Sequence, residues 1–123
     1  MRYDQGKNVT EGSEELPYIE DEALPLFTSV QNGLLRLLPD ALRGVEDEEI
    51  TYYTPERRPI LTVIPDGSGL RLLLPRTRDT YPDVGGLEES HRRFGSWLEY
   101  VYDDAGSEIP MLLLVATAII NAR

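Results

Sequence analysis

Residues 50–74 read ITYYTPERRPILTVIPDGSGLRLLL, and this stretch holds three short apolar runs separated by turn residues. The runs Ile50–Thr54, Ile60–Ile64 and Leu70–Leu74 are rich in β-branched, aromatic or leucine side chains, which favours strands. The sequence Pro65–Gly69 predicts a turn, because glycine adopts positive φ at no steric cost. We therefore expect three consecutive strands, of which the last two form an antiparallel hairpin.

A helix is predicted before these strands, over Leu24–Leu38, because apolar side chains recur there every four positions. Pro25 is tolerated only in a first turn, and Pro39 stops the helix. The segment Asp40–Gly44 is predicted to add one more helical turn, with Asp40 as its cap.

A loop, a fourth strand and a last helix are predicted after residue 74. Residues 75–94 are rich in proline, glycine and arginine, with room for a short helix at 87–94. Trp97–Tyr102 is predicted as a strand, and Ser107 as the N-cap of a helix over Glu108–Ala122. That helix is apolar on nearly every side, so it must be covered on more than one side. The cover is either the sheet with the first helix, or the sheet with a partner chain.

These elements predict an α+β fold, a two-layer sandwich with an antiparallel meander of about four strands. An N-terminal and a C-terminal helix pack on one face of the sheet. The length of 123 residues allows one domain. Residues 1–17 are polar and acidic, which predicts a flexible N-terminal arm before a single α+β domain at 18–123.

Charge and cysteine content exclude several classes of protein. The formal net charge is −10 and the pI is about 4.5, which argues against general nucleic-acid binding. The chain has no cysteine, which excludes disulfides, thiolate zinc sites, iron–sulfur clusters and a cysteine nucleophile. The first 20 residues lack a secretory pattern, and the apolar run Met111–Ile120 is shorter than the roughly 20 residues that span a bilayer. We expect a cytoplasmic protein without membrane association.

Few residues suggest catalysis or metal binding. His91 is the only histidine, and the adjacent Ser90 would not face it on a helix. The acidic runs at 20–22 and 46–49 lack the spacing of a calcium loop. Asp103 and Asp104 form a pair that either serves acid–base chemistry or starts a turn. No catalytic residue, metal or cofactor is predicted.

Seven arginines from the middle of the chain form the strongest candidate binding surface. Guanidinium groups bind carboxylates and phosphates bidentately, so the set favours an anionic group or an acidic partner segment. The alternative is pairing with residues 1–56, which hold 13 acidic and 4 basic side chains. The set is Arg57, Arg58, Arg71, Arg76, Arg78, Arg92 and Arg93.

A protein interface is predicted on the last helix and the fourth strand, because large apolar and aromatic side chains dominate interfaces. Its residues are Trp97, Met111, Leu113, Leu114 and Ala118.

The order of several features resembles a known small domain. These are Tyr52-Tyr53, an apolar strand ending in Pro65, the Gly69–Leu72 strand, and Gly95-Ser96-Trp97 before an apolar C-terminal helix. The order is similar to that of the uncharacterised α+β domain at the C-termini of bacterial restriction-associated and predicted-transport proteins. The resemblance covers about residues 24–122 and implies the same fold with an accessory or binding role. It implies no catalytic residues.

Three functions remain open at this stage. The first is a non-enzymatic protein-binding or adaptor domain, which forms a homo-oligomer or docks on a larger protein. The second is an anionic-ligand-binding or hydrolytic domain that uses the arginines with His91 and Asp103 or Asp104. The third is an acidic anti-defence or immunity-type inhibitor that mimics nucleic acid.

Overall fold

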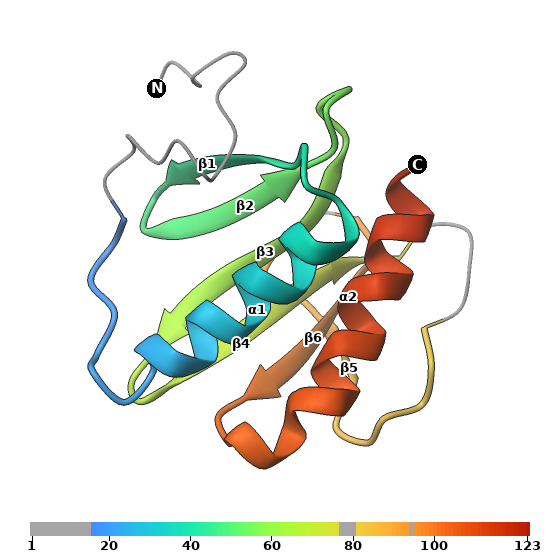
Figure 1. The fold of residues 1–123 in the computed structure, drawn as a ribbon. Helices are drawn as coiled ribbons and strands as arrows, with labels where there is room; N and C mark the ends of the chain where they lie inside the picture. Colours follow the sequence, from blue (N-terminus) through green and yellow to red (C-terminus); the bar gives the residue numbers. More distant parts are fainter. Residues whose placement is uncertain (1–15, 77–80, 94) are drawn as a thin grey trace.

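The protein is described by a computed structural model that covers residues 16–76, 81–93 and 95–123. The predicted arm at 1–17 lies outside these residues except for Leu16 and Pro17, and Arg78 also lies outside them. The described part of the chain forms six strands, two α-helices and one 3₁₀ turn (Figure 1). Their bounds are α1 Leu24–Leu37, β1 Leu42–Glu46, β2 Glu49–Tyr53, β3 Pro59–Asp66, β4 Gly69–Pro75, β5 Glu88–Ser90, β6 Trp97–Tyr102, η1 Ala105–Ser107 and α2 Glu108–Ala122.

The strands of the described residues form one antiparallel sheet in the order β1-β2-β3-β4-β6-β5. Both helices lie side by side against the same face of this sheet (Figure 1). The prediction of an α+β fold is confirmed. The sheet departs from a simple meander, because β6 lies between β4 and β5.

Two segments differ from the prediction made from sequence. The predicted helical turn at Asp40–Gly44 is wrong, because Leu42–Glu46 forms strand β1. The short helix at 87–94 is also wrong, because Glu88–Ser90 forms β5. Both are edge strands with a strand neighbour on one side only, and neither Leu42–Glu46 nor Glu88–Ser90 has the alternating apolar pattern that marks a strand. The described sheet therefore has six strands where about four were expected.

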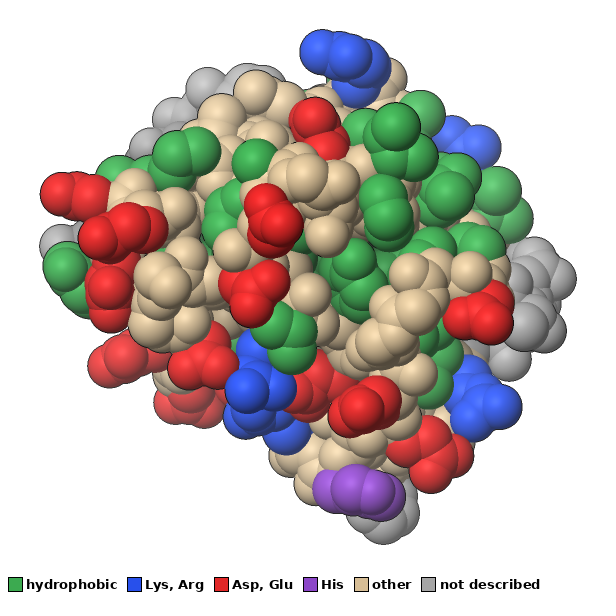
Figure 2. All heavy atoms as spheres, turned by 90° about the horizontal axis from the view of Figure 1, so that it is seen from below, with side chains coloured by type: hydrophobic (Ala, Val, Ile, Leu, Met, Phe, Trp, Pro, Cys, Tyr) green, Lys and Arg blue, Asp and Glu red, His purple; other side chains and the backbone are tan. Residues whose placement is uncertain are grey.

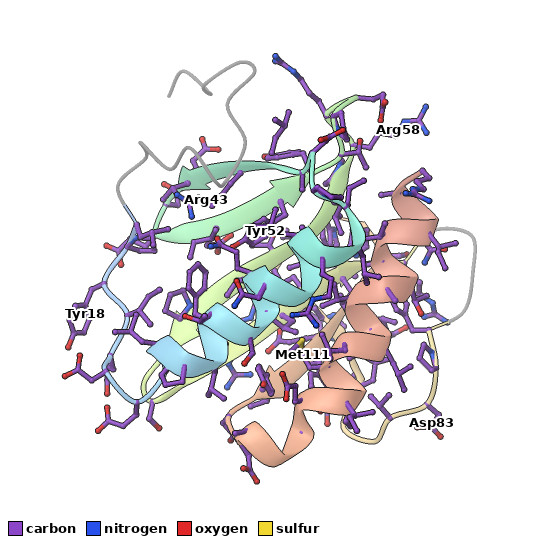
Figure 3. All side chains as sticks on the ribbon, in the orientation of Figure 1. Tyr18, Arg43, Tyr52, Arg58, Asp83 and Met111 are labelled. Atoms are coloured by element: carbon purple, nitrogen blue, oxygen red, sulfur yellow. The ribbon has the colours of Figure 1, made fainter. Side chains whose placement is uncertain are left out.

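One row of apolar side chains crosses four strands beneath the helices. Ile50, Val63, Leu72 and Tyr100 are in register across β2, β3, β4 and β6, and all four are buried. Met111 of α2 joins the same core (Figure 3). Since side chains alternate along a strand, the intervening residues face away from the helices. The sheet therefore keeps a second face for other contacts.

A small polar group lies between α1 and the first two strands. Gln31 Oε1 accepts hydrogen bonds from Tyr52 Oη at 2.8 Å and from Arg43 Nη1 at 3.0 Å. Arg43 and Tyr52 both lie on the helix side of the sheet (Figure 3). Burial raises the pKa of Tyr52 well above its ordinary value, and the Arg43 charge offsets part of that rise. The phenol is therefore neutral and ties α1 to β2.

Two-residue turns join two of the strand pairs. Asp47 and Glu48 connect β1 to β2 with φ angles of 54° and 62°. This left-handed pair is the turn that matches the twist of a hairpin, although glycine or asparagine is its usual residue. Between β3 and β4 the predicted turn is confirmed, with Gly67 at φ 60°.

The helices approach each other closely where α1 has a glycine. A Cβ on Gly33 would overlap the side chain of Leu112 of α2. At the start of α2, Ser107 stands at the predicted N-cap position, but its side chain makes no capping hydrogen bond. Asp104 instead accepts a hydrogen bond of 3.0 Å from the Gly106 amide and caps the 3₁₀ turn η1. Because η1 leads directly into α2, the side-chain cap of this helical segment is Asp104, one turn before the expected Ser107.

One helical segment of the described residues is long and apolar enough to cross a membrane by length and composition. It is Ala105–Ala122, with a mean hydropathy of 1.5 and a third of its residues buried. The core helix of a globular domain meets the same criteria, so the finding is weak evidence in either direction.

Candidate functional site

A pocket of about 440 Å³ lies on the face of the sheet that the helices leave uncovered. We call it the sheet-face pocket. It is formed by β1, β2, the turn between them, the start of β3, and the chain that leads into β6. Its lining residues are Gly44, Glu46, Asp47, Glu49, Thr51, Tyr53, Pro59, Arg93 and Trp97.

Strand alternation explains the floor of this pocket. Glu49, Thr51 and Tyr53 are alternate residues of β2 and therefore share one face. Thr51 Oγ1 and Thr62 Oγ1 are hydrogen-bonded at 2.8 Å across β2 and β3. Thr62 is fully buried, so the hydrogen bond with Thr51 satisfies a hydroxyl that water does not reach.

The wall of the pocket is made by Arg93 and Trp97. Arg93 forms an ion pair with Glu49 of β2, although the two residues are 44 positions apart in the chain. In the sheet, β3, β4 and β6 lie between β2 and β5, the strand that precedes Arg93. The Arg93 guanidinium carbon also lies 5.0 Å from the centroid of the Trp97 ring. A cation at this distance from an indole is attracted by the ring quadrupole. The two contacts fix the chain before β6 over the sheet face.

Three of the other predicted arginines, Arg71, Arg76 and Arg92, pair with carboxylates in two separate groups. Arg71 pairs with Asp66 and Glu99, each at 2.6 Å. Arg92 also pairs with Glu99, at 2.8 Å. The remaining ion pair of this set joins Arg76 to Glu89 at 3.3 Å. These arginines therefore do not converge on one open anion site.

Arg57 and Arg58 lie on the exposed turn between β2 and β3, where Figure 3 labels Arg58. Arg58 lines a second hollow of about 400 Å³ together with Glu56 and Arg123. The sequence left two interpretations of the arginine set, an anion-binding surface or pairing with the acidic residues 1–56. Arg93 agrees with the second interpretation, because its partner is Glu49. The other ion-pair partners described here come from residues 66–99.

Glu99 is the centre of the largest of these charged groups. Its oxygens accept hydrogen bonds from Arg71, Arg92 and Ser90, and its side chain is 14% exposed. Burial raises the pKa of Glu99, but the hydrogen bonds from Arg92, Arg71 and Ser90 lower it more. The net pKa lies below its ordinary value of 4.5. Glu99 is therefore ionised at neutral pH and joins β4 to the chain after β5.

His91 stands apart from the aspartates proposed to work with it. Ser90 pairs with Trp97 at one end of β6, whereas Asp103 follows Tyr102 at the other end. A strand of six residues separates the two ends by about 20 Å. His91 is exposed at the surface (Figure 2), beside a hollow of about 110 Å³ that Arg76 and Glu89 also line. The structure does not bring His91 and Asp103 or Asp104 into one site.

The predicted interface on α2 needs correction. Met111, Leu114 and Ala118 are buried in the core, so they offer no surface to a partner. Leu113 is 49% exposed and is available. Two further residues of α2 that the prediction omitted are more exposed, Ile109 at 72% and Ile120 at 54%. Hydrophobic side chains gather in one area of the face shown in Figure 2.

The residues that sequence reasoning missed are on β2 and at the first turn. The sequence shows that Glu49, Thr51 and Tyr53 are alternate residues of one strand and share one face of the sheet. It does not show that this face of the sheet carries a pocket. The contact of Arg93 with Glu49 had no local signal, because it depends on the path of the chain before β6.

Comparison of this chain with family models, with curated proteins and with solved structures found no significant match. The resemblance to the small α+β domain stays an expectation, and the function is inferred from the two surfaces described above.

Proposed function

We propose that this chain is a non-enzymatic protein-binding domain that associates with a second copy of itself through α2. The observation that carries the proposal is the exposed apolar side of this helix, formed by Ile109, Leu113 and Ile120. Isolated exposed apolar residues are ordinary on a protein surface, but an aligned set marks an interaction site.

The spacing of this side supports a helix partner. Ile109, Leu113, Ala116 and Ile120 are separated by four, three and four residues, which is the seam along which two helices pack. The small side chain of Ala116 in the middle of the seam allows a close approach. A second α2 would present the same seam, so the contact would be self-complementary about a two-fold axis.

The charge distribution favours a second copy as the partner. Residues 109–122 contain no charged side chain, whereas the chain as a whole carries −10. A strongly acidic protein repels itself over most of its surface. Two copies would avoid that repulsion best where the uncharged helices face each other.

Light scattering after size-exclusion chromatography tests the proposal. At tens of micromolar we expect a mass near twice the 13.9 kDa of the chain. Leu113→Glu places a charge in the seam and should give a monomer with an unchanged circular dichroism spectrum. Leu24→Glu is the matched control, because Leu24 is similarly exposed, at 42%, but lies on α1. It should remain a dimer.

Two results would overturn the proposal. One is a monomer for the unaltered chain at these concentrations. The other is equal masses for the unaltered chain and Leu113→Glu. Leu114→Glu is unsuitable, because Leu114 is fully buried and its substitution would test folding instead.

A further inference from the structure

The sheet-face pocket lies across the sheet from α2, so it offers a second surface that self-association through α2 leaves open. Its lining includes three carboxylates, on Glu46, Asp47 and Glu49, and one guanidinium, on Arg93. Their formal charges sum to −2. A pocket with this charge attracts cations and repels phosphates and carboxylates.

Aromatic rings complete the chemistry of the pocket. Tyr53 and Trp97 both line it. Aromatic faces next to carboxylates are a common arrangement for binding organic cations, because the ring quadrupole and the negative charge act together. The charge and the rings therefore select the same class of ligand.

The protein already places one such cation at this site. The Arg93 guanidinium lies 5.0 Å from the centre of the Trp97 ring and is paired with Glu49. Its side chain is 30% exposed, so it is held at the surface of the pocket and is not sealed in the core. Arg93 thus demonstrates the geometry with which an arginine from outside would be bound.

We propose that the sheet-face pocket binds an arginine side chain of a partner protein segment, and that Arg93 is an internal ligand which this arginine displaces. The incoming guanidinium stacks on Trp97 and pairs with Glu49, while Glu46 and Asp47 hold the positive charge at the rim. Arginine fits better than lysine, because a planar guanidinium both stacks on an indole and donates two hydrogen bonds to one carboxylate.

Fluorescence gives a direct readout, since Trp97 is the only tryptophan of the chain. The full chain is titrated with the peptide acetyl-Gly-Ser-Arg-Ser-Gly-amide. Two further peptides replace the arginine by citrulline, which is neutral and of the same shape, or by lysine. We expect a saturable change in Trp97 emission with the arginine peptide, at least fivefold weaker binding of the lysine peptide, and none of the citrulline peptide.

Removal of the internal ligand sharpens the test. Arg93→Gln removes the internal cation from Glu49 and from the face of Trp97, so it should tighten binding of the arginine peptide at least fivefold. Arg92→Gln is the matched control, because Arg92 is the adjacent arginine and pairs with Glu99 outside the pocket. It should leave the affinity within twofold. Adding Glu49→Gln to Arg93→Gln should abolish the gain.

Three results would overturn the inference. They are equal binding of the arginine and citrulline peptides, an affinity of Arg93→Gln no higher than that of the unaltered chain, and an equal gain for Arg92→Gln. Thermal unfolding of each variant shows whether the chain is still folded. Where Arg93→Gln unfolds, Arg93→Lys replaces it, and it should tighten binding because lysine holds Glu49 and the indole less well. The mass of the protein is measured in parallel, so loss of self-association is distinguishable from loss of peptide binding.

Discussion

Arg71 of β4 and Glu99 of β6 meet across the sheet, with Nη1 of the arginine 2.6 Å from Oε2 of the glutamate. Their strands are directly paired, and the residues are diagonal neighbours, since Glu99 stands opposite Leu73 and Arg71 opposite Val101. Arg92 reaches the other oxygen of Glu99. One carboxylate therefore links β4, β6 and the chain after β5.

Replacing this carboxylate should destabilise the protein. Glu99→Gln removes the charged acceptor of Arg71 and Arg92, and Glu99 is 14% exposed. We expect the free energy of unfolding to fall by about 1–2 kcal/mol, since hydrogen bonds to charged groups contribute more than neutral ones. Urea denaturation at pH 7 measures the change.

The control for Glu99→Gln is Glu89→Gln. Glu89 pairs with Arg76 at 3.3 Å, but the two side chains are 69% and 56% exposed. Exposed ion pairs are screened by water, so the change in unfolding free energy should stay below about 0.5 kcal/mol. Equal losses for the two variants would contradict the central role of Glu99.

The same group predicts a dependence on pH. The pKa of Glu99 is lower in the folded protein than its ordinary value of 4.5. A lowered pKa means that the unfolded chain binds the proton first, so the ionised form stabilises the fold. The contribution is present above pH 4.5 and is lost as the pH falls through the folded pKa. The stability difference between the unaltered chain and Glu99→Gln should therefore shrink on acidification, and a constant difference from pH 7 to pH 3 would be the contrary result.

Two buried tyrosines should respond differently to loss of the hydroxyl. Tyr52 Oη donates to Gln31, so Tyr52→Phe should lower the free energy of unfolding by about 1 kcal/mol. Tyr102 Oη is buried and makes no hydrogen bond of ordinary geometry within the described residues, although Ser29 lies near enough to offset part of the rise that burial causes in its pKa. Tyr102→Phe should leave the free energy of unfolding unchanged or raise it, because the substitution removes a hydroxyl that loses its hydrogen bonds to water on folding. Urea denaturation of both variants compares them, and a larger loss for Tyr102→Phe would contradict the assignment.

The turn between β1 and β2 should gain stability from a glycine. Glu48 is exposed and holds φ at 62°, a conformation that disfavours side chains with a Cβ. Glu48→Gly should raise the free energy of unfolding by about 1 kcal/mol, because it removes that strain. Glu48→Ala is the control and should give no such gain, since alanine keeps the Cβ. Thermal unfolding distinguishes them, and equal midpoints would show that the turn is unstrained.

The predicted and observed elements agree where local chemistry decides the outcome. Residues 50–74 contain the three strand patterns and the turn at Gly67, and each lies where it was expected within one or two residues. Helix α1 follows from periodic apolar residues and from Pro39, and α2 follows from the long apolar run after Ser107. Strand β1 was missed because Leu42–Glu46 has no strong pattern of its own, and its partner β2 lies beyond a turn without glycine.

The candidate site was less predictable than the fold. Arg93 and Trp97 were both named from the sequence, but Glu49, Thr51 and Tyr53 were not connected with them. An arginine can pair with any carboxylate that the fold brings near, and this chain has 22 acidic residues. The sequence also left the orientation of α2 open. Its side chains are apolar on nearly every side, so the sequence alone did not separate the residues that are exposed from those that are buried.

The sequence by itself determined the secondary structure of the core, the α+β class, and the acidic, cysteine-free chemistry of the chain. These properties depend on side-chain type and on spacing along a few residues. Only the tertiary structure decided that Ile109 and Ile120 are exposed while Met111 and Leu114 are buried in the core. It also decided that Arg93 rests between Glu49 and Trp97. Such contacts join residues far apart in the chain, and their selection depends on how the whole sheet and its helices pack.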